Sequence, residues 1–136
     1  MGFYLEPYHR SIKAPLSPGT YAYGRAFEHF FILECIRLND YERADDRFYY
    51  MRTKDDVEID LIIERPNREV WAIEVKSSER VDASDFNRAV ALAKDLKVKR
   101  FIVASREQKR RTLKDIEIWP WRDVLEVLYP SSNTRP

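Results

Sequence analysis

Glycine, cysteine and histidine are scarce in this chain of 136 residues. The three glycines, at positions 2, 19 and 24, are too dispersed to build a glycine-rich phosphate loop, so no P-loop or dinucleotide fingerprint can be assembled from them. The single cysteine, Cys35, excludes an internal disulfide and a cysteine-based zinc site. Two histidines, His9 and His29, are too few for a histidine-rich metal site.

Long apolar runs and a signal-like N-terminus are also missing. No stretch of about 18 or more apolar residues occurs, so we expect no membrane-spanning helix. The first residues show no basic segment followed by an apolar one, which argues against a secretion signal. Together with the single cysteine, these absences predict a reducing, cytoplasmic setting.

The composition is that of a globular domain, with 44% hydrophobic and 35% charged residues. A chain of this length buries about two-thirds of its unfolded surface, which is enough for one core. We expect one domain over residues 18–128. An arm, or a short strand plus loop, precedes it over residues 1–20, where prolines interrupt any period, and a loose tail follows over residues 130–136.

Charge is balanced overall but not along the chain. Twenty-four basic and 23 acidic residues give a net charge of +1. In the basic segment, residues 94–114, nine basic residues stand against two acidic ones, so this segment carries +7 and the rest of the chain −6. A basic stripe on a neutral protein is typical of contact with a phosphate backbone, although a solvated loop and helix end give the same pattern. The predicted nucleic-acid-binding residues are Arg100, Arg106, Lys109, Arg110 and Arg111.

The apolar spacing predicts an alternation of helices and strands. Phe27, Phe31 and Cys35 follow the helical repeat, which predicts a helix over residues 21–38 with Thr20 as its N-cap. Alternating apolar residues predict a half-buried strand over 57–63, and a continuous apolar run predicts a strand covered on both faces over 70–75. Further strands are expected over 48–51, 101–104 and 116–119, a second helix from Asp82, and a final helix over 121–128.

The order of these elements predicts the fold class. A turn at residues 65–68 joins strands 57–63 and 70–75 into a hairpin. The helix that follows makes a crossover, which places strand 101–104 parallel to strand 70–76. We therefore expect an α/β fold with a mixed central β-sheet flanked by helices on both faces.

Charged residues interrupt the two strands of this hairpin. Glu74, Val75 and Lys76 end the buried strand, and alternation places Glu74 and Lys76 on one face and Val75 on the other. Asp60 interrupts the apolar residues of the neighbouring strand. The hairpin turn would bring Asp60 and Glu74 roughly opposite each other, within reach of one ion.

The juxtaposed carboxylates indicate a cation. Burying two carboxylates side by side costs roughly several kcal/mol unless something compensates. Mg²⁺ compensates directly, since it takes oxygen ligands and is commonly held by one or two carboxylates plus waters and substrate phosphates. Lys76 would lie beside the ion, where it can hold a water or a phosphate oxygen, so the pattern favours metal-assisted phosphodiester hydrolysis. The alternative is an ordinary ion pair between Glu74 and Lys76 at a strand end.

Three segments of the chain also resemble a known family. Asp60 followed by Glu74-Val75-Lys76, with Glu28 on a preceding helix, resembles the PD-(D/E)XK nuclease superfamily. More specifically, residues 18–128 resemble the C-terminal domain of unknown function that follows the AAA-type ATPase module in many prokaryotic proteins. The segments that carry this resemblance are GRAFEHF at 24–30, RTKDDVEID at 52–60 and AIEVKSS at 72–78.

The resemblance implies a restriction-endonuclease-like core and a role for each site residue. Asp60 and Glu74 would be metal ligands, with the Val75 carbonyl as a third, and the ion would be Mg²⁺ or Mn²⁺. Lys76 would position or polarise the attacking water, and Glu28 would hold a water or a second ion. The proline of the family's name is absent, because Ile59 precedes Asp60.

Two functions are therefore expected from the sequence. The first is a metal-dependent endonuclease that hydrolyses phosphodiester bonds in DNA. The second is a catalytically silent module with the nuclease fold, which binds nucleic acid or regulates an AAA-type ATPase on another segment or chain. The resemblance also suggests a homodimer, because nucleases of this kind often cut two strands as dimers, and nothing in either reading involves a membrane.

Overall fold

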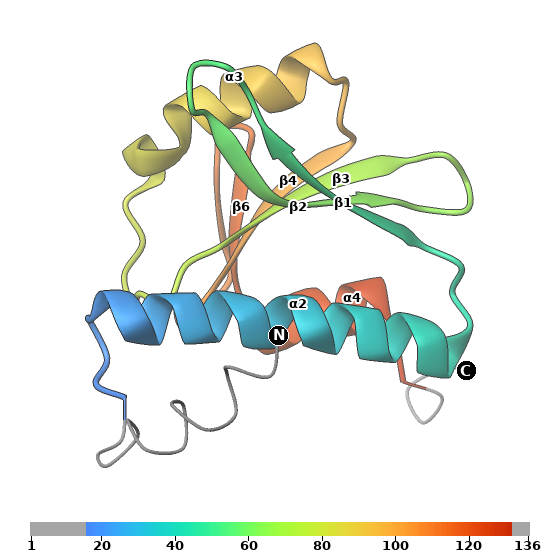
Figure 1. The fold of residues 1–136 in the computed structure, drawn as a ribbon, viewed down its shortest axis with the longest axis horizontal. Coiled ribbons are helices and arrows are strands. Elements are labelled where there is room, and N and C mark those ends of the chain that lie inside the picture. Colours follow the sequence, from blue (N-terminus) through green and yellow to red (C-terminus); the bar gives the residue numbers. More distant parts are fainter. Residues whose placement is uncertain (1–15, 132–136) are drawn as a thin grey trace, which may run out of the picture.

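The computed structural model describes residues 16–131, which form a mixed sheet between helices on both faces (Figure 1). The predicted α/β class is thus confirmed. The expected arm over residues 1–20 and tail over 130–136 lie mostly outside the described residues. The elements are α2 (Tyr21–Glu42), β1 (Arg47–Arg52), β2 (Glu58–Glu64), β3 (Val70–Val75), the 3-10 turn η2 (Ala83–Phe86), α3 (Asn87–Asp95), β4 (Arg100–Ser105), β5 (Arg111–Leu113), β6 (Ile116–Pro120) and α4 (Trp121–Leu128).

The strand order of the sheet is β1-β2-β3-β4-β6-β5. β1, β2 and β3 are antiparallel neighbours, β3, β4 and β6 are parallel, and β5 returns antiparallel to β6. The predicted hairpin of β2 and β3 and the predicted parallel pairing of β3 with β4 are both confirmed. The sequence pattern did not predict β5, because this strand has only three residues and none of them is buried.

Two cores lie on the two faces of the sheet. α2 and α4 cover one face, where Phe31 and Cys35 pack with Val124 and Leu128 (Figure 1). η2 and α3 cover the other face, where Phe86 and the alanines of α3 pack against β4 and β6. Because both faces are covered, every residue of β3 and β4 after the first is buried. No helix within residues 16–131 combines the length and the hydropathy that crossing a membrane requires.

The first helix is longer than predicted. Thr20 caps its N-terminus as expected, since its hydroxyl accepts the backbone N–H of Tyr23 at 3.2 Å. The helix continues to Glu42 rather than ending near Leu38, and Arg43 then takes a left-handed conformation (φ 52°). Within the extra turn, the Asn39 side chain accepts the backbone N–H of Asp46 at 2.8 Å, which ties the helix to the segment before β1.

The second helix begins later than predicted. Asp82 acts as the expected cap, but its carboxylate accepts the N–H of Ser84 at the start of the 3-10 turn η2. The α-helix itself starts at Asn87 and ends at Asp95. The last helix begins at Trp121 and ends at Leu128, as predicted.

A β-bulge interrupts β2 next to Asp60. Tyr49 pairs with Ile62 and Met51 pairs with Ile59, so two steps along β1 correspond to three steps along β2. The additional residue falls between Ile59 and Ile62, in the segment that contains Asp60. Bulges of this kind redirect a side chain locally, and here the residue affected is a candidate site residue.

The bulge also corrects the predicted alternation over residues 57–63. Ile59 and Ile62 belong to the core beneath α3, whereas Leu61 and Ile63 belong to the core beneath α2 and α4. A strand of strict period two would put Ile59, Leu61 and Ile63 on one face. The prediction of a half-buried strand is therefore wrong, because both faces of β2 are covered and one extra residue changes the alternation.

Candidate metal and nuclease site

The candidate site lies where the main-chain ladder between β2 and β3 stops. The last paired residues are Leu61 and Ile73. One step further along, the side chain of Asp60 takes over, and its Oδ2 accepts the backbone N–H of Val75 at 2.9 Å. This bond holds the Asp60 carboxylate against the end of β3, at the peptide that joins Glu74 to Val75.

Glu74 is the buried member of the pair, with 7% of its surface exposed. Burial raises the pKa of Glu74 far above its usual range, and a hydrogen bond shared with the Asp60 carboxyl and the negative charge of Asp60 raise it further. The structure thus brings the two predicted carboxylates together.

Glu28 completes an acidic cluster from the other side. The pKa of Glu28 is raised by partial burial and by the charge of Asp60, while Arg25 opposes the shift. Gly24 lies one helical turn earlier, and a Cβ at this position would be in ordinary contact with the Ser77 hydroxyl, at 3.6 Å. α2 thus packs beside the segment after β3, and Glu28, four residues further along the same helix face, lies near enough to Asp60 and Glu74 for their charges to interact.

Lys76 extends β3 beyond its last assigned residue. Its backbone N–H donates to the Ala104 carbonyl at 2.9 Å, which continues the parallel pairing with β4. The Lys76 side chain is exposed and lies two residues past Glu74, on the same side of the strand. An exposed ammonium on the residue that follows β3 is free to bind a water or an anionic ligand.

The donor set has the chemistry that a hard divalent cation requires. Asp60 and Glu74 supply carboxylate oxygens. The N–H of Val75 points toward β2, and its carbonyl points to the same edge, because the two groups of one strand residue face the same neighbour. Within residues 16–131, no group of three or more His, Cys, Asp or Glu side chains could hold a metal by itself. Two carboxylates, one carbonyl and waters nevertheless fit the usual ligands of Mg²⁺.

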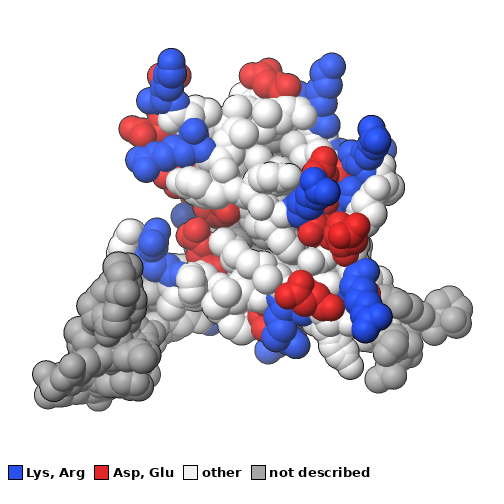
Figure 2. All heavy atoms as spheres, turned by 45° about the vertical axis from the view of Figure 1, so that its right-hand side comes forward, with Lys and Arg blue, Asp and Glu red and all other residues white. Residues whose placement is uncertain are grey.

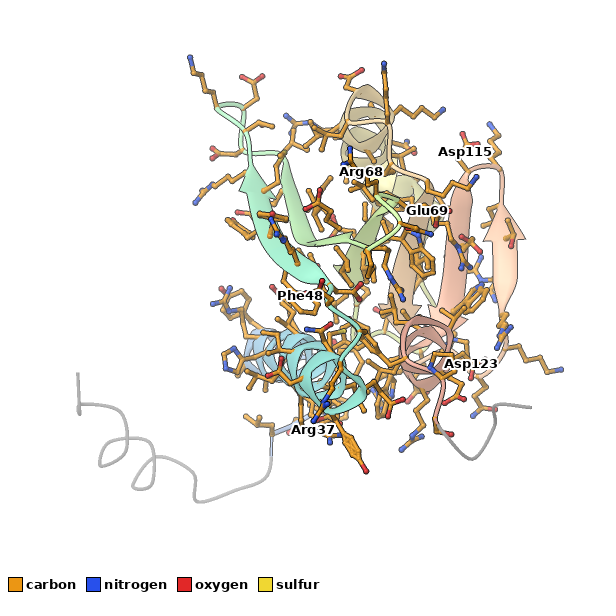
Figure 3. The ribbon with its side chains drawn as sticks, turned by 90° about the vertical axis from the view of Figure 1, so that its right-hand side faces the viewer. Arg37, Phe48, Arg68, Glu69, Asp115 and Asp123 are labelled. Atoms are coloured by element: carbon orange, nitrogen blue, oxygen red, sulfur yellow. The ribbon has the colours of Figure 1, made fainter. Side chains whose placement is uncertain are left out.

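The basic segment does not form one stripe in the fold. β4 runs through it, so Arg100 begins the strand and Arg106 follows its far end, separated by about 20 Å of extended chain. Figure 3 labels two acidic residues that bind basic residues from the two ends of this segment. Asp115, bound to Lys94, lies at one end of the sheet, and Asp123, bound to Arg110, lies at the other.

All four predicted nucleic-acid-binding arginines have acidic partners. Arg100 makes two hydrogen bonds to Glu117, at 2.7 and 2.8 Å, and its guanidinium covers the rings of Trp71 and Trp119. It therefore takes part in a structural contact with β3 and β6. Acidic and basic side chains alternate on the face shown in Figure 2, without one large basic patch. The other ion pairs are Arg106–Glu79, Arg110–Asp123 and Arg111–Glu107.

Two groups of contacts could not be seen in the sequence. Arg106 binds the segment that follows Lys76, through contacts to residues 77–79. At the opposite end of the sheet, the Tyr129 hydroxyl donates to Asp46 Oδ2 at 2.6 Å, and Arg65 Nε lies 3.0 Å from Asp46 Oδ1. Asp46 and Tyr129 are 83 residues apart, so no local pattern could have indicated this buried cluster.

Comparison with known proteins places the chain in a family. Residues 23–124 match the family described as Domain of unknown function (DUF4143). The matched range contains Glu28, Asp60, Glu74 and Lys76, the four residues of the candidate site. No curated protein and no solved structure gives a significant match. Because the match extends over about three quarters of the sequence, the chain belongs to the DUF4143 family, a domain of unknown function.

Proposed function

We propose that this domain is a metal-dependent nuclease that hydrolyses phosphodiester bonds in DNA, on a restriction-endonuclease-like core. The observation that carries the proposal is the pairing of two carboxyls at one strand end. Asp60 is fixed by the Val75 N–H at 2.9 Å, and Glu74 is buried against it. An acidic pair of this kind is costly in an empty fold and is stabilised by a divalent cation.

The topology supports this assignment. One helix, an antiparallel hairpin with its acidic residues, a crossover helix and a parallel strand follow one another as α2, β2–β3, α3 and β4. The site lies at the carboxyl end of β3, next to the carboxyl ends of β4 and β6. Ligands of open α/β sheets commonly bind outside the carboxyl ends of the strands.

Each site residue then has a role in the proposed reaction. Asp60, Glu74 and the Val75 carbonyl would hold Mg²⁺ or Mn²⁺, which supplies Lewis acidity to a phosphodiester and lowers the pKa of a bound water. Lys76 places an ammonium at the mouth of the site, where it orients a water or neutralises a phosphate oxygen. Glu28, whose charge interacts with that of Asp60, would accept a hydrogen bond from a water on the α2 side of the site.

Lys109 and Arg110 are the proposed contacts to the DNA backbone. Both follow β4 at the end of the sheet where Glu74 lies, and both are exposed. Arg110 covers the Trp119 ring at 4.1 Å and binds Asp123 at 2.8 Å, so its guanidinium is held in place at this surface. Neutralising a few phosphates would give weak, salt-dependent binding.

The second candidate function is a catalytically silent module, which binds nucleic acid or regulates an AAA-type ATPase partner. It rests on the exposed basic residues Lys109 and Arg110, which a silent module can use as well as a nuclease. A module of this kind needs the fold and the surface but no cation at Asp60 and Glu74.

A cleavage assay with matched variants distinguishes the nuclease from the catalytically silent module. The purified chain is incubated with supercoiled plasmid, circular single-stranded DNA or RNA, in Mg²⁺, Mn²⁺ or EDTA. Asp60→Asn, Glu74→Gln and Lys76→Ala should each lower the rate by about 100-fold or more. Glu64→Gln, at the opposite end of β2, is the control and should cleave normally. Equal cleavage by all variants would indicate contamination, and salt-dependent binding without cleavage would support the silent module.

A further inference from the structure

We infer that Arg106 is a positioning residue, which fastens the segment after Lys76 to the first turn of α2. Its part in catalysis rests on the proposed nuclease function, whereas the contacts themselves do not. Lys76 and Glu28 belong to different elements and must be held in register for one site. Arg106 lies between these two elements, directly after β4.

Arg106 contacts three consecutive residues of the segment after Lys76. Its backbone N–H donates to the Ser78 carbonyl at 3.1 Å. Its Nη1 donates to the Ser77 carbonyl at 3.3 Å, and its Nη2 binds Glu79 Oε1 at 3.1 Å. Main chain and side chain of one residue thus hold the segment that begins immediately after the exposed lysine.

The other side of the guanidinium faces α2. Its central carbon lies 5.3 Å from the centre of the Tyr23 ring, in the first turn of the helix. The next residue, Gly24, is the one that approaches Ser77 closely, and Glu28 follows one turn later. Arg106 therefore bridges the two segments that carry Lys76 and Glu28.

A phosphate contact fits this geometry less well. Only 26% of the Arg106 side chain is exposed, compared with 54% for Arg110. Both Nη atoms of Arg106 already bind protein oxygens, one of them a carboxylate. The planar fork of arginine suits two simultaneous acceptors, and a lysine would supply the charge but not this geometry.

The residues that follow Arg106 fix the remainder of the same connection. Glu107 is buried, and its Oε2 accepts the Val81 N–H at 2.7 Å. Arg111 binds Glu107 and also donates to the Val81 carbonyl. Residues 77–81 are thus held throughout by the segment after β4, and Arg106 holds the end nearest to Lys76. Fixing a reacting group in this way lowers the entropic cost of reaching the productive geometry.

The test compares Arg106→Ala and Arg106→Lys with the wild-type chain. Arg88→Ala is the matched control, since Arg88 also donates to a loop carbonyl, that of Asp55 at 3.0 Å, but on the α3 side of the sheet. Amide hydrogen exchange of Lys76, Val81 and residue 106, whose N–H groups donate to Ala104, Glu107 and Ser78, reports the fastening without any activity. We expect about 10-fold faster exchange in both Arg106 variants and none of this change in Arg88→Ala.

Single-turnover cleavage and DNA binding report the catalytic part. Both Arg106 variants should lower the cleavage rate by about 10-fold or more and change the Kd for DNA by less than about twofold. A weaker Kd in Arg106→Ala that Arg106→Lys restores would assign Arg106 to a phosphate instead and overturn the inference. If the wild-type chain does not cleave DNA, the nuclease proposal fails. Hydrogen exchange then tests by itself whether Arg106 holds the segment after Lys76. Unchanged exchange at residues 76, 81 and 106 would overturn the inference.

Discussion

The carboxylate of Asp60 accepts the backbone N–H of Val75 at 2.9 Å, one step beyond the last main-chain pair of β2 and β3. A side chain thus takes the place of a main-chain carbonyl in the ladder. The bulge in β2 adds a residue in the same segment, so the strand bends where the carboxylate is needed. Asp60 has a structural bond and a proposed ligand role at once.

Removing the Asp60 acceptor should destabilise the fold. Asp60→Ala leaves the N–H of Val75, a residue with 9% of its surface exposed, without its partner. We expect a loss of about 1–3 kcal/mol in the free energy of unfolding by urea denaturation in EDTA. Asp60→Asn keeps an acceptor and should lose less. Equal losses for the two variants would show that the bond to Val75 is not the cause.

Replacing Glu74 by glutamine should stabilise the chain in the absence of divalent cations. The pKa of Glu74 is raised in the fold by burial and by Asp60, so its favourable contribution is complete below the unfolded pKa and is lost as pH rises through the folded pKa. Glu74→Gln does not ionise. In EDTA, its advantage over the wild-type chain should grow from pH 4 toward pH 8, by about 1–4 kcal/mol. A difference independent of pH would contradict this assignment of the raised pKa.

Divalent cations should stabilise the wild-type chain selectively. Binding to the native state alone raises the free energy of unfolding by about 2.7 kcal/mol at 100 times the Kd. Thermal unfolding in Mn²⁺ should therefore show a higher Tm for the wild-type chain and for Glu64→Gln, but no shift for Glu74→Gln. The same shift in all three chains would mean that the ion binds elsewhere.

Substituting Arg100 should lower the stability of the fold, whereas substituting Arg110 should weaken DNA binding. Arg100→Ala removes two hydrogen bonds to Glu117 and the cover over two tryptophans, so we expect a loss of about 1–3 kcal/mol in unfolding free energy. The DNA binding of Arg100→Ala should have the same salt dependence as that of the wild-type chain. Arg110→Ala should instead reduce the slope of log K against log salt by about 1. The reverse result would assign the phosphate contact to Arg100 instead of Arg110.

Tyr129→Phe should destabilise the chain more at neutral than at acidic pH. Burial raises the pKa of Asp46, and the Tyr129 hydroxyl is one of the groups that oppose this shift. Without the hydroxyl, ionising Asp46 costs more as pH rises above about 3.9. We expect a loss of about 1–3 kcal/mol at pH 7 and a smaller loss at pH 4. Tyr41→Phe, with 70% of the Tyr41 surface exposed, is the control and should have no effect.

Much of the fold could be predicted from local patterns. The N-cap at Thr20, the hairpin, the parallel strand and the last helix all follow from rules that act over a few residues. The juxtaposition of Asp60 and Glu74 is local in the same sense, because one short turn joins their strands. These features are confirmed since propensity, alternation and turn chemistry agree on them.

The basic segment shows where this reasoning fails. Consecutive basic residues suggest one surface, yet a buried strand runs through the segment and separates its ends. The acidic partners Glu79, Glu117 and Asp123 come from other elements, and their distances along the sequence carry no periodic signal. Charge counted along the chain is therefore a poor measure of charge on a surface.

The sequence by itself determined which elements form, in what order, and which strand ends carry the acidic residues. Tertiary structure alone decided that both faces of β2 are covered, that a bulge redirects the segment at Asp60, and that Arg106 binds the segment after Lys76. The physical reason is the distance along the chain over which each interaction acts. Local backbone preferences act over a few residues, whereas burial, ion pairing and close helix approach depend on groups that meet only when distant segments pack together.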